Sequence, residues 1–437
     1  MSSSPGQPAS PPLTQRKDFW VLMGYAVVLG VIGAFAGLAF MGVTGAGNNW
    51  FTGVHLGWFS GQWWWLAVTV AAGLVVGLLR RWIRLPGQIP GLVAGLRDEK
   101  VDYSLVPGVV IVSAVSLIGG ASLGPEKALG YIGGGTGTWI ARHRGLGKED
   151  SQANTLDGYA GAYGGLFSST VIVVMMIMEV ARPGGRRLGK ALAGCIVASS
   201  VSSGIYFAIA GALFLGAYHV PKFAFHDWQL LAGVPLGLFA ALVVTLLGAC
   251  MTAAARLFGR LNLPAVASPV LGGAVFGLAG VALPLTMFTG SGELGTALGH
   301  AATMGAGLIA ATMVGKMITF AVSEASGFVG GPIFPAIFIG GMAGLLVHLV
   351  IPDVPLGLSF ACLLAAVPGS LVAAPFSMVL LAAFLTQVGA LQTAPVLIAV
   401  ITAFLTVEGV RYLAGQRKKP AQPGQHPAAR PQRPAPG

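Results

Sequence analysis

Long apolar stretches follow one another along most of the chain. The first, residues 19–41, is long enough to supply the ~20 residues that a helix needs to cross the hydrocarbon core of a bilayer. Further apolar runs cover residues 63–79, 193–217, 230–255, 356–367 and 394–405. Several runs are short or interrupted by Gly and Pro, which favours half-helices and tilted spans over a regular bundle. The pattern therefore predicts an all-α polytopic membrane protein.

Composition agrees with this pattern. Of the 437 residues, 55% are hydrophobic and only 9% are charged, whereas a soluble domain carries about 25% charged residues. The three cysteines all lie in apolar runs, and their spacing does not suit a metal site. We therefore expect a multi-pass protein of the cell membrane, with the lipid bilayer as its surroundings.

The net charge of +11 raises the question of nucleic-acid binding, but the placement of the cations argues against it. They gather at the chain ends and in short loops, at residues 16–17, 80–84, 142–144, 182–190 and 417–419. This placement fits the excess of Lys and Arg in cytoplasmic loops of membrane proteins. We expect both termini to be cytoplasmic, and the clusters to lie against anionic lipid heads.

Polar segments divide the chain into parts. Residues 1–17 and 415–437 are polar and Pro-rich, and are expected to be disordered. Between them, residues 145–152 are interpreted as a loop, and residues 219–228, with aromatics beside two histidines, as a membrane–water interface. The second interruption separates two expected membrane repeats, residues 18–218 and 228–414.

The two halves resemble each other when one is shifted by 207 positions. The shift places Gly120, Gly124, Pro125, Ile132, Gly133, Gly134 and Gly137 on Gly327, Gly331, Pro332, Ile339, Gly340, Gly341 and Gly344. Both segments are rich in Gly, and a shift of 210 also pairs three glycines. The match indicates two structural repeats. If their topology is inverted, broken helices from each half should meet near the membrane midplane and form the substrate site.

Three similar elements, residues 86–95, 119–130 and 326–341, read as a Gly-rich turn, a Pro and then an apolar helix. Pro is favoured in the first turn of a helix, where its missing N–H has no partner to lose. The free N–H donors and the dipole of a helix N-terminus attract anions. Helix packing through small residues is the competing interpretation of any single element. Three such elements favour an anion site.

Four segments together resemble one family. SGFVGGPIFPAIFIGG (326–341), SLGPEKALGYIGG (122–134), GQIP (87–90) and MEVARP (178–183) are similar to motifs of the CLC family of chloride channels and proton-coupled chloride transporters. The resemblance covers about residues 20–414, with the motifs in the family's order. It implies two inverted helical repeats, a homodimer with one pore per subunit for chloride or a similar small anion, and no cofactor.

The first two motifs carry over with changes. In the family's Gly-Ser-Gly-Ile-Pro the coordinating Ser falls on Gly87, so the anion-binding candidates are Gly87 and, if its amide replaces the hydroxyl, Gln88. The second motif, Gly-Lys/Arg-Glu-Gly-Pro, begins at Gly124. Its Glu, the gate and outer proton carrier of the family, falls on Glu126. The basic residue has become Pro125, and Lys127 replaces the following Gly. The resemblance makes Gly124 and Lys127 further anion-binding candidates.

The later motifs also depart from the family. Gly-x-Phe-x-Pro maps to residues 331–335, where Ile333 and Phe334 keep their backbone donors and the proline before them loses one. MEVARP resembles Glu-Glu-Met-Arg-Pro, and Val180 occupies the place of the inner proton-transfer Glu. The family's late anion-contacting Tyr matches Tyr412 only loosely.

These substitutions suggest a mechanism. The Glu126 carboxylate would compete with the anion for backbone donors, and protonation would release it. An acid in the first turn of a helix can also be a simple cap, worth about 0.3–1 kcal/mol. Because proton coupling needs titratable groups along a path across the membrane, Val180 favours passive conduction with Glu126 as a gate only.

Other functions stay open at this point. A proton-coupled antiporter could use Glu126 with an unfamiliar inner relay. A cation or neutral-solute carrier would need acids along a path, for which Glu126, Glu179, Glu293 and Glu324 are the candidates. An intramembrane serine protease would pair Ser122 with His300 or His348. Lys316, another ionisable residue in an apolar stretch, is expected to be structural, and we expect no enzyme.

Overall fold

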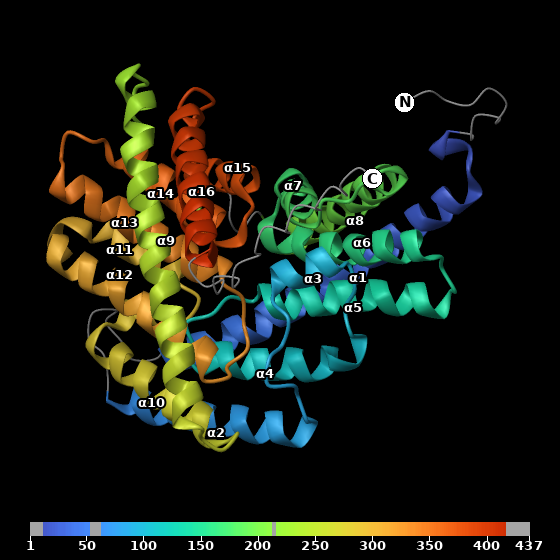
Figure 1. Ribbon diagram of the computed structural model, residues 1–437, viewed down its shortest axis with the longest axis horizontal. Coiled ribbons are helices and arrows are strands. Elements are labelled where there is room, and N and C mark those ends of the chain that lie inside the picture. The colour runs from blue at the N-terminus through green and yellow to red at the C-terminus, as the bar shows by residue number, and fades with distance from the viewer. Residues whose placement is uncertain (1–11, 53–62, 212–215, 417–437) are drawn as a thin grey trace, which may run out of the picture.

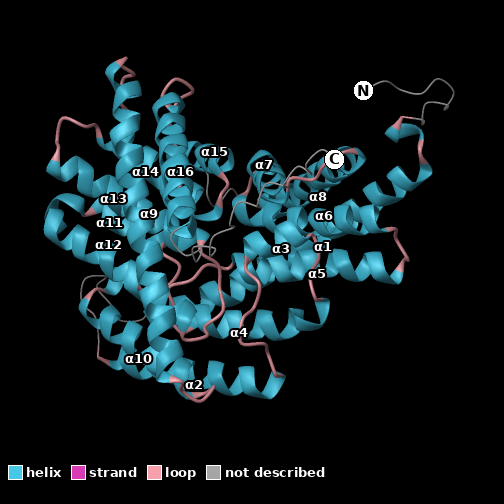
Figure 2. Cartoon of the chain, viewed as in Figure 1, coloured by secondary structure: helices cyan, strands magenta, loops and turns pink. Residues whose placement is uncertain are grey.

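The computed structural model describes residues 12–52, 63–211 and 216–416. The described chain consists of helices and loops, and its one bridge of strand type is a single residue pair, as Figure 2 shows. Most of the two tails that were expected to be disordered lies outside these residues. Within their described parts, Leu13–Gln15 form a 3-10 helix and the last α-helix continues to Gln416.

The α-helices of the described residues form two runs of eight (Figure 1). The first run is α1 (Lys17–Thr52), α2 (Trp64–Ile83), α3 (Leu92–Asp98), α4 (Val106–Ile118), α5 (Glu126–His143), α6 (Lys148–Phe167), α7 (Thr170–Ala181) and α8 (Arg186–Ala210). The second is α9 (Trp228–Leu261), α10 (Ala267–Ala282), α11 (Ser291–Gly299), α12 (Ala301–Ala325), α13 (Ile333–Val350), α14 (Leu356–Val372), α15 (Pro375–Thr386) and α16 (Thr393–Gln416). Short 3-10 helices, Tyr103–Leu105 and Pro284–Thr286, precede α4 and α11.

The packing within the first run repeats in the second. Helix α5 packs on α6 and α6 on α8, just as α13 packs on α14 and α14 on α16. The long first helix of each run, α1 or α9, lies against the last helix of the same run. The all-α fold of two inverted repeats that the sequence predicted is confirmed.

Equivalent helices also meet where the two repeats join. Helix α2 packs on α10, and α7 packs on α15. Elements that contact their own counterparts must lie close to the axis that relates the repeats. The starts of α5 and α13 are a further such pair, so a site at these starts is built from both halves of the chain.

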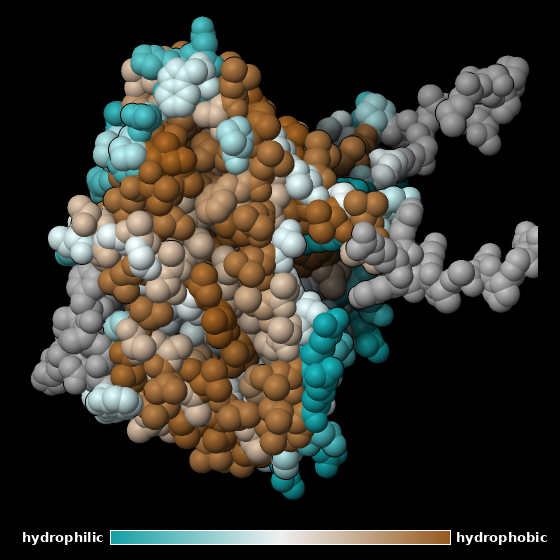
Figure 3. Space-filling model, turned by 60° about the vertical axis from the view of Figure 1, so that its left-hand side comes forward, coloured by the Kyte–Doolittle hydropathy of each residue, from teal (hydrophilic) through white to brown (hydrophobic). Residues whose placement is uncertain are grey.

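The outer surface suits a bilayer. Seven described helices are long and apolar enough to cross a membrane, and shorter apolar helices accompany them. Figure 3 shows a face covered by a broad hydrophobic surface, with hydrophilic residues gathered along its edges. Helix α9 contributes exposed leucines such as Leu231 and Leu242, which are 77% and 63% exposed. Apolar side chains exposed over such an area are what lipid tails would cover.

One loop is shorter than expected. Residues 145–152 were interpreted as a loop, but α6 begins at Lys148. Glu149 and Asp150 occupy the first turn of this helix, where acidic side chains interact favourably with the positive end of the helix dipole. The polar residues of this segment therefore form the first turn of α6 and not a loop.

Glycines allow the inner helices to approach closely. A Cβ at Gly133 on α5 would collide with the carbonyl oxygen of Gly158 on α6, and a Cβ at Gly158 would collide with that of Gly133. Small residues at such crossings let helix backbones pack in membranes, where no hydrophobic driving force holds helices together. This contact fixes α5, whose first residue is Glu126.

We expect Gly133→Val to destabilise the protein by about 1–3 kcal/mol or more, because the added side chain overpacks the α5–α6 contact. The thermal melting temperature of the detergent-solubilised protein measures this. Gly24→Val is the matched control, since Gly24 also lies in a helix and a Cβ there meets nothing within 4 Å. Equal melting temperatures for the two variants would contradict the close α5–α6 contact.

Candidate functional site

The second and third Gly-Pro elements meet directly. The N–H of Gly124 donates to the carbonyl oxygen of Gly331 at 2.8 Å, and the N–H of Gly331 donates to that of Gly124 at 2.7 Å. Each glycine is followed by a proline that precedes the first residue of a helix, α5 or α13. The antiparallel pair therefore brings two helix N-termini, one from each repeat, to one place.

Glu126 lies at this meeting point. Its side chain is fully buried, and its Oε1 accepts a hydrogen bond from the backbone N–H of Phe334 at 2.8 Å. The backbone N–H groups of Ile333 and of Glu126 itself also lie near the carboxyl group. Within the described residues, Oε2 has no hydrogen-bond partner. The first turn of α13 thus offers its free donors to a side chain that begins α5.

Neighbouring residues pack closely around the Glu126 carboxyl group. A Cβ at Gly124 or at Gly331 would collide with it. The Tyr163 hydroxyl on α6 donates to the Glu126 carbonyl oxygen at 2.9 Å and fixes the backbone. The ring of Phe334 stacks on Phe167, with ring centroids 6.3 Å apart and an interplanar angle of 9°. Sequence reasoning missed Tyr163 and Phe167, because only tertiary packing brings the end of α6 to the start of α5.

A large cavity leads toward this site. It has a volume of about 830 Å³, and its wall includes Gly87, Gln88, Lys127, Phe328 and Val329. We call it the vestibule. The last two residues lie shortly before Gly331, so the vestibule reaches the segment that pairs with Gly124. Gly87 and Gln88 face this cavity, whereas Ile333 and Phe334 lie at Glu126.

Arg80 ties the two sides of the vestibule together. Its Nη1 donates to the carbonyl oxygen of Gly327 at 2.5 Å, and its Nη2 donates to those of Pro86 and Gly87 at 2.8 and 3.0 Å. One guanidinium group therefore joins the first and third Gly-Pro elements. The sequence showed Arg80 only as a member of a basic loop cluster, and no local signal distinguishes it from the other cations there.

Comparison with known proteins agrees with this geometry. The family model described as voltage gated chloride channel matches residues 71–408. The chain belongs to the CLC family. It is 27% identical over 327 residues to the putative ion-transport protein YfeO of Salmonella newport (strain SL254), covering 70% of this chain and 74% of that protein.

Solved structures share the fold. A slow cyanobacterial Cl–/H+ antiporter superposes with a TM-score of 0.77 at 17% identity, covering 94% of this chain and all of the other. A CLC-type fluoride/proton antiporter gives a TM-score of 0.73 at 16% identity, covering 92% and 97% of the two chains. Members of the CLC family are channels and transporters, so this protein transports anions and is not an enzyme.

The other site residues expected from the CLC resemblance occupy different places. Val180 is buried near the end of α7, with 3% of its surface exposed. Tyr412 lies near the end of α16 and is 66% exposed. Among the described residues, neither lines the vestibule nor contacts Glu126. The structure thus does not bring Tyr412 to the anion site.

Glu179 has a structural task. Its Oε1 accepts a hydrogen bond from the N–H of Phe376 at 2.7 Å, and its Oε2 accepts from the N–H of Ser377 at 2.9 Å and from the Ser377 hydroxyl at 2.6 Å. The carboxylate therefore caps the N-terminus of α15, in the other repeat. Such a cap satisfies backbone donors that have no partner within the helix.

Lys316, His300 and His348 are bound by backbone groups in the described part of the chain, and Glu293 is buried in the first turn of α11. Lys316 is fully buried, and its Nζ donates to the carbonyl oxygens of Met287 and Phe288 at 2.9 and 2.8 Å. This agrees with a structural role. The Nδ1 atoms of His300 and His348 lie 3.0 and 2.8 Å from carbonyl oxygens of Thr296 and Val354. Ser122 has neither histidine as a hydrogen-bond partner in the described part of the chain.

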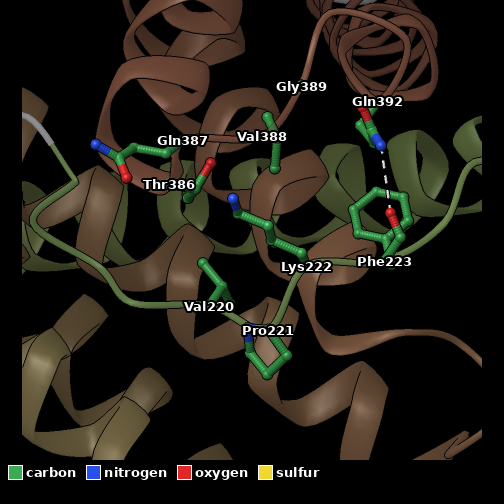
Figure 4. Close-up of a pocket in the computed structure, with 9 residues that line it drawn as sticks. All are labelled: Val220, Pro221, Lys222, Phe223, Thr386, Gln387, Val388, Gly389 and Gln392. Atoms are coloured by element: carbon green, nitrogen blue, oxygen red, sulfur yellow. Dashed lines mark hydrogen bonds between the residues drawn. The ribbon is translucent and has the colours of Figure 1, made fainter.

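A separate, smaller cavity of about 160 Å³ lies between the segment before α9 and the turn after α15 (Figure 4). Lys222 extends toward Thr386 and Gln387 there, and the Nε2 of Gln392 donates to the carbonyl oxygen of Phe223 at 3.2 Å. The residues that line it include none from the three Gly-Pro elements. This cavity is therefore distinct from the vestibule.

We expect Glu179→Gln to lower the free energy of unfolding by about 1–3 kcal/mol, because an amide cannot accept all three hydrogen bonds as a charged group does. Thermal unfolding of the solubilised protein measures the loss. Glu408→Gln is the control, since Glu408 forms an ion pair with Arg411 in which both side chains are 47% exposed, and such pairs contribute little. An equally small loss for both variants would argue against the cap.

Proposed function

We propose that this protein conducts chloride or a similar small anion passively through the site of Glu126, which acts as the gate. The hydrogen bond from the Phe334 N–H to the Glu126 carboxylate carries the proposal. A helix N-terminus that attracts an anion is occupied by the protein's own negative charge. Anion and carboxylate cannot use the same donor, so conduction requires the side chain to leave.

We propose that anion passage is not coupled to proton movement, and the residues at the end of α7 support this. Val180 cannot carry a proton, and the neighbouring Glu179 holds three hydrogen bonds at the start of α15. Moving protons across the membrane needs a chain of titratable groups. The end of α7 therefore offers no free carboxylate that could accept a proton from the cytoplasmic side. The second candidate function is proton-coupled antiport, which the names of the two structural neighbours favour.

The sidedness follows from where the basic loops gather. Lys190 at the start of α8 pairs with Asp18 at the start of α1 and with Asp150 at the start of α6. Asp98 lines both the vestibule and a cavity that includes Lys148. The basic loops, the start of α1 and the vestibule therefore share one side, which we assign to the cytoplasm of a cell-membrane protein.

Two further assignments complete this function. Gln392, just before α16, contacts Phe223, just before α9, so these long helices begin together. Since the end of α9 lines the vestibule, α16 would also end on the cytoplasmic side, as α1 begins there. A homodimer with one anion pathway per subunit is the assembly that the family resemblance implies.

We expect Glu126→Gln to raise chloride efflux at neutral pH by about tenfold, because a hydrogen bond to a charged acceptor is worth about 1.5–3 kcal/mol and 1.4 kcal/mol is a factor of ten. Efflux through the unaltered protein should rise as the pH falls and the carboxylate gains a proton, while the variant should be insensitive to pH. Proteoliposome efflux over a range of pH tests both. Glu408→Gln, at an exposed carboxylate, should behave like the unaltered protein. Unchanged efflux from folded Glu126→Gln would leave Glu126 as a helix cap only.

Paired chloride and proton fluxes decide between the two candidate functions. With the voltage clamped by a potassium ionophore, we expect chloride efflux from proteoliposomes without proton movement. Proton uptake in fixed proportion to chloride efflux would establish antiport and reject passive conduction. Failure to move any anion would reject both candidates.

A further inference from the structure

Lys127 is a largely buried cation for which the described residues provide no hydrogen-bond or ion-pair partner. Only 8% of its surface is exposed, and it forms neither a hydrogen bond nor an ion pair within the described residues. A buried charge is costly unless another group compensates it. The side chain lines the vestibule, so a ligand in that cavity can supply the missing partner.

The other charged groups of the vestibule do not fill this role. The guanidinium group of Arg80 is occupied by carbonyl oxygens of Pro86, Gly87 and Gly327. Glu324 and Asp98 are exposed, and neither pairs with Lys127.

Glu126 directly precedes Lys127 in the chain, but its Oε1 accepts a hydrogen bond from the N–H of Phe334 in the other repeat. Lys127 is therefore the buried end of a vestibule whose acidic groups are exposed to solvent.

We propose that the Lys127 ammonium group binds a small inorganic anion in the vestibule, at a site separate from that of Glu126, and that Glu324 is its built-in competitor. The inference rests on the proposed function, because the bound anion is the one that is transported. The family motif that this segment resembles has Lys or Arg two positions earlier, where this chain has Pro125, and Gly at position 127, so the cation occupies a different place in this chain. Gln88, on the same cavity wall, offers an amide as a second donor.

Glu324 explains how such a site can release its anion. Conduction needs binding that is favourable enough for entry and weak enough for exit. A carboxylate in the same cavity as the ammonium group lowers the affinity for any incoming anion. Glu324 lines the same cavity as Lys127 and carries the opposite charge, although the two form no ion pair within the described residues. Lys127 would attract the anion and Glu324 would weaken its binding, so that the anion could both enter and leave the vestibule.

Four variants test the proposal: Lys127→Met, Lys127→Arg, Glu324→Gln and the double variant Lys127→Met/Glu324→Gln. Chloride binding to the solubilised protein by isothermal titration gives Kd, and proteoliposome efflux gives the chloride concentration at half-maximal rate. Lys222→Met is the matched control, because Lys222 is a lysine of the separate cavity in Figure 4. All variants are first checked for an unchanged elution profile and melting temperature.

We expect Lys127→Met to raise the Kd for chloride by about fivefold or more, the effect of roughly one unit charge about 4 Å away in a wet cavity. Lys127→Arg keeps the charge and should stay within about twofold of the unaltered protein. Glu324→Gln should lower the Kd, and this gain should disappear when Lys127 is Met. Lys222→Met should change neither quantity.

Two results would overturn the inference. One is chloride binding by folded Lys127→Met that equals that of the unaltered protein. The other is an equal effect of Glu324→Gln with and without Lys127, which would show that the two residues act independently. If Lys127→Met does not fold, an unchanged Kd for Glu324→Gln overturns the competition. Loss of all anion flux in the unaltered protein would instead reject the proposed function.

Discussion

The contact between the Phe334 amide and the Glu126 carboxylate is the interaction on which the rest of the site depends. It places a negative charge at the N-terminus of a helix, where free donors and the helix dipole stabilise it. The carboxylate is buried, so little else could compensate its charge. Whatever replaces it must also be an anion. In the proposed function, the same physical requirement governs both the closed gate and the choice of what passes.

This contact exists only because the two repeats meet at equivalent points. Gly124 and Gly331 pair through two backbone hydrogen bonds, and neither position has room for a Cβ beside the carboxyl group. Proline follows each glycine and starts a helix at a position where its missing N–H costs nothing. The glycines thus serve close approach, and the prolines set the directions of α5 and α13. Neither repeat alone could form the site, since one supplies the acid and the other the donor.

Charges outside this contact distinguish the chain from the family motifs that its sequence resembles. The inner end of α7 carries Val180, and the adjacent Glu179 is used as a helix cap. In the vestibule, Lys127 stands where the family has Gly. Relative to the family motifs, Val180 replaces a titratable group, and the basic residue of the second motif is lost at Pro125 while a lysine stands two positions later, at Lys127. In the proposed function, the first of these changes favours anion passage over proton exchange.

The sequence by itself determined the membrane class, the helical fold and the position of the central acid. Apolar runs of membrane length, a shift of 207 residues between the halves and the order of four motifs were enough, because each is a local or periodic property of the chain. It could not find Tyr163, Phe167 or Arg80, and it matched Tyr412 to a site that this residue does not reach. Only the tertiary structure decided these, since such contacts join residues that are far apart in the chain. Burial, which made Lys127 an unpaired cation and Glu179 a cap, likewise depends on which helices surround a side chain.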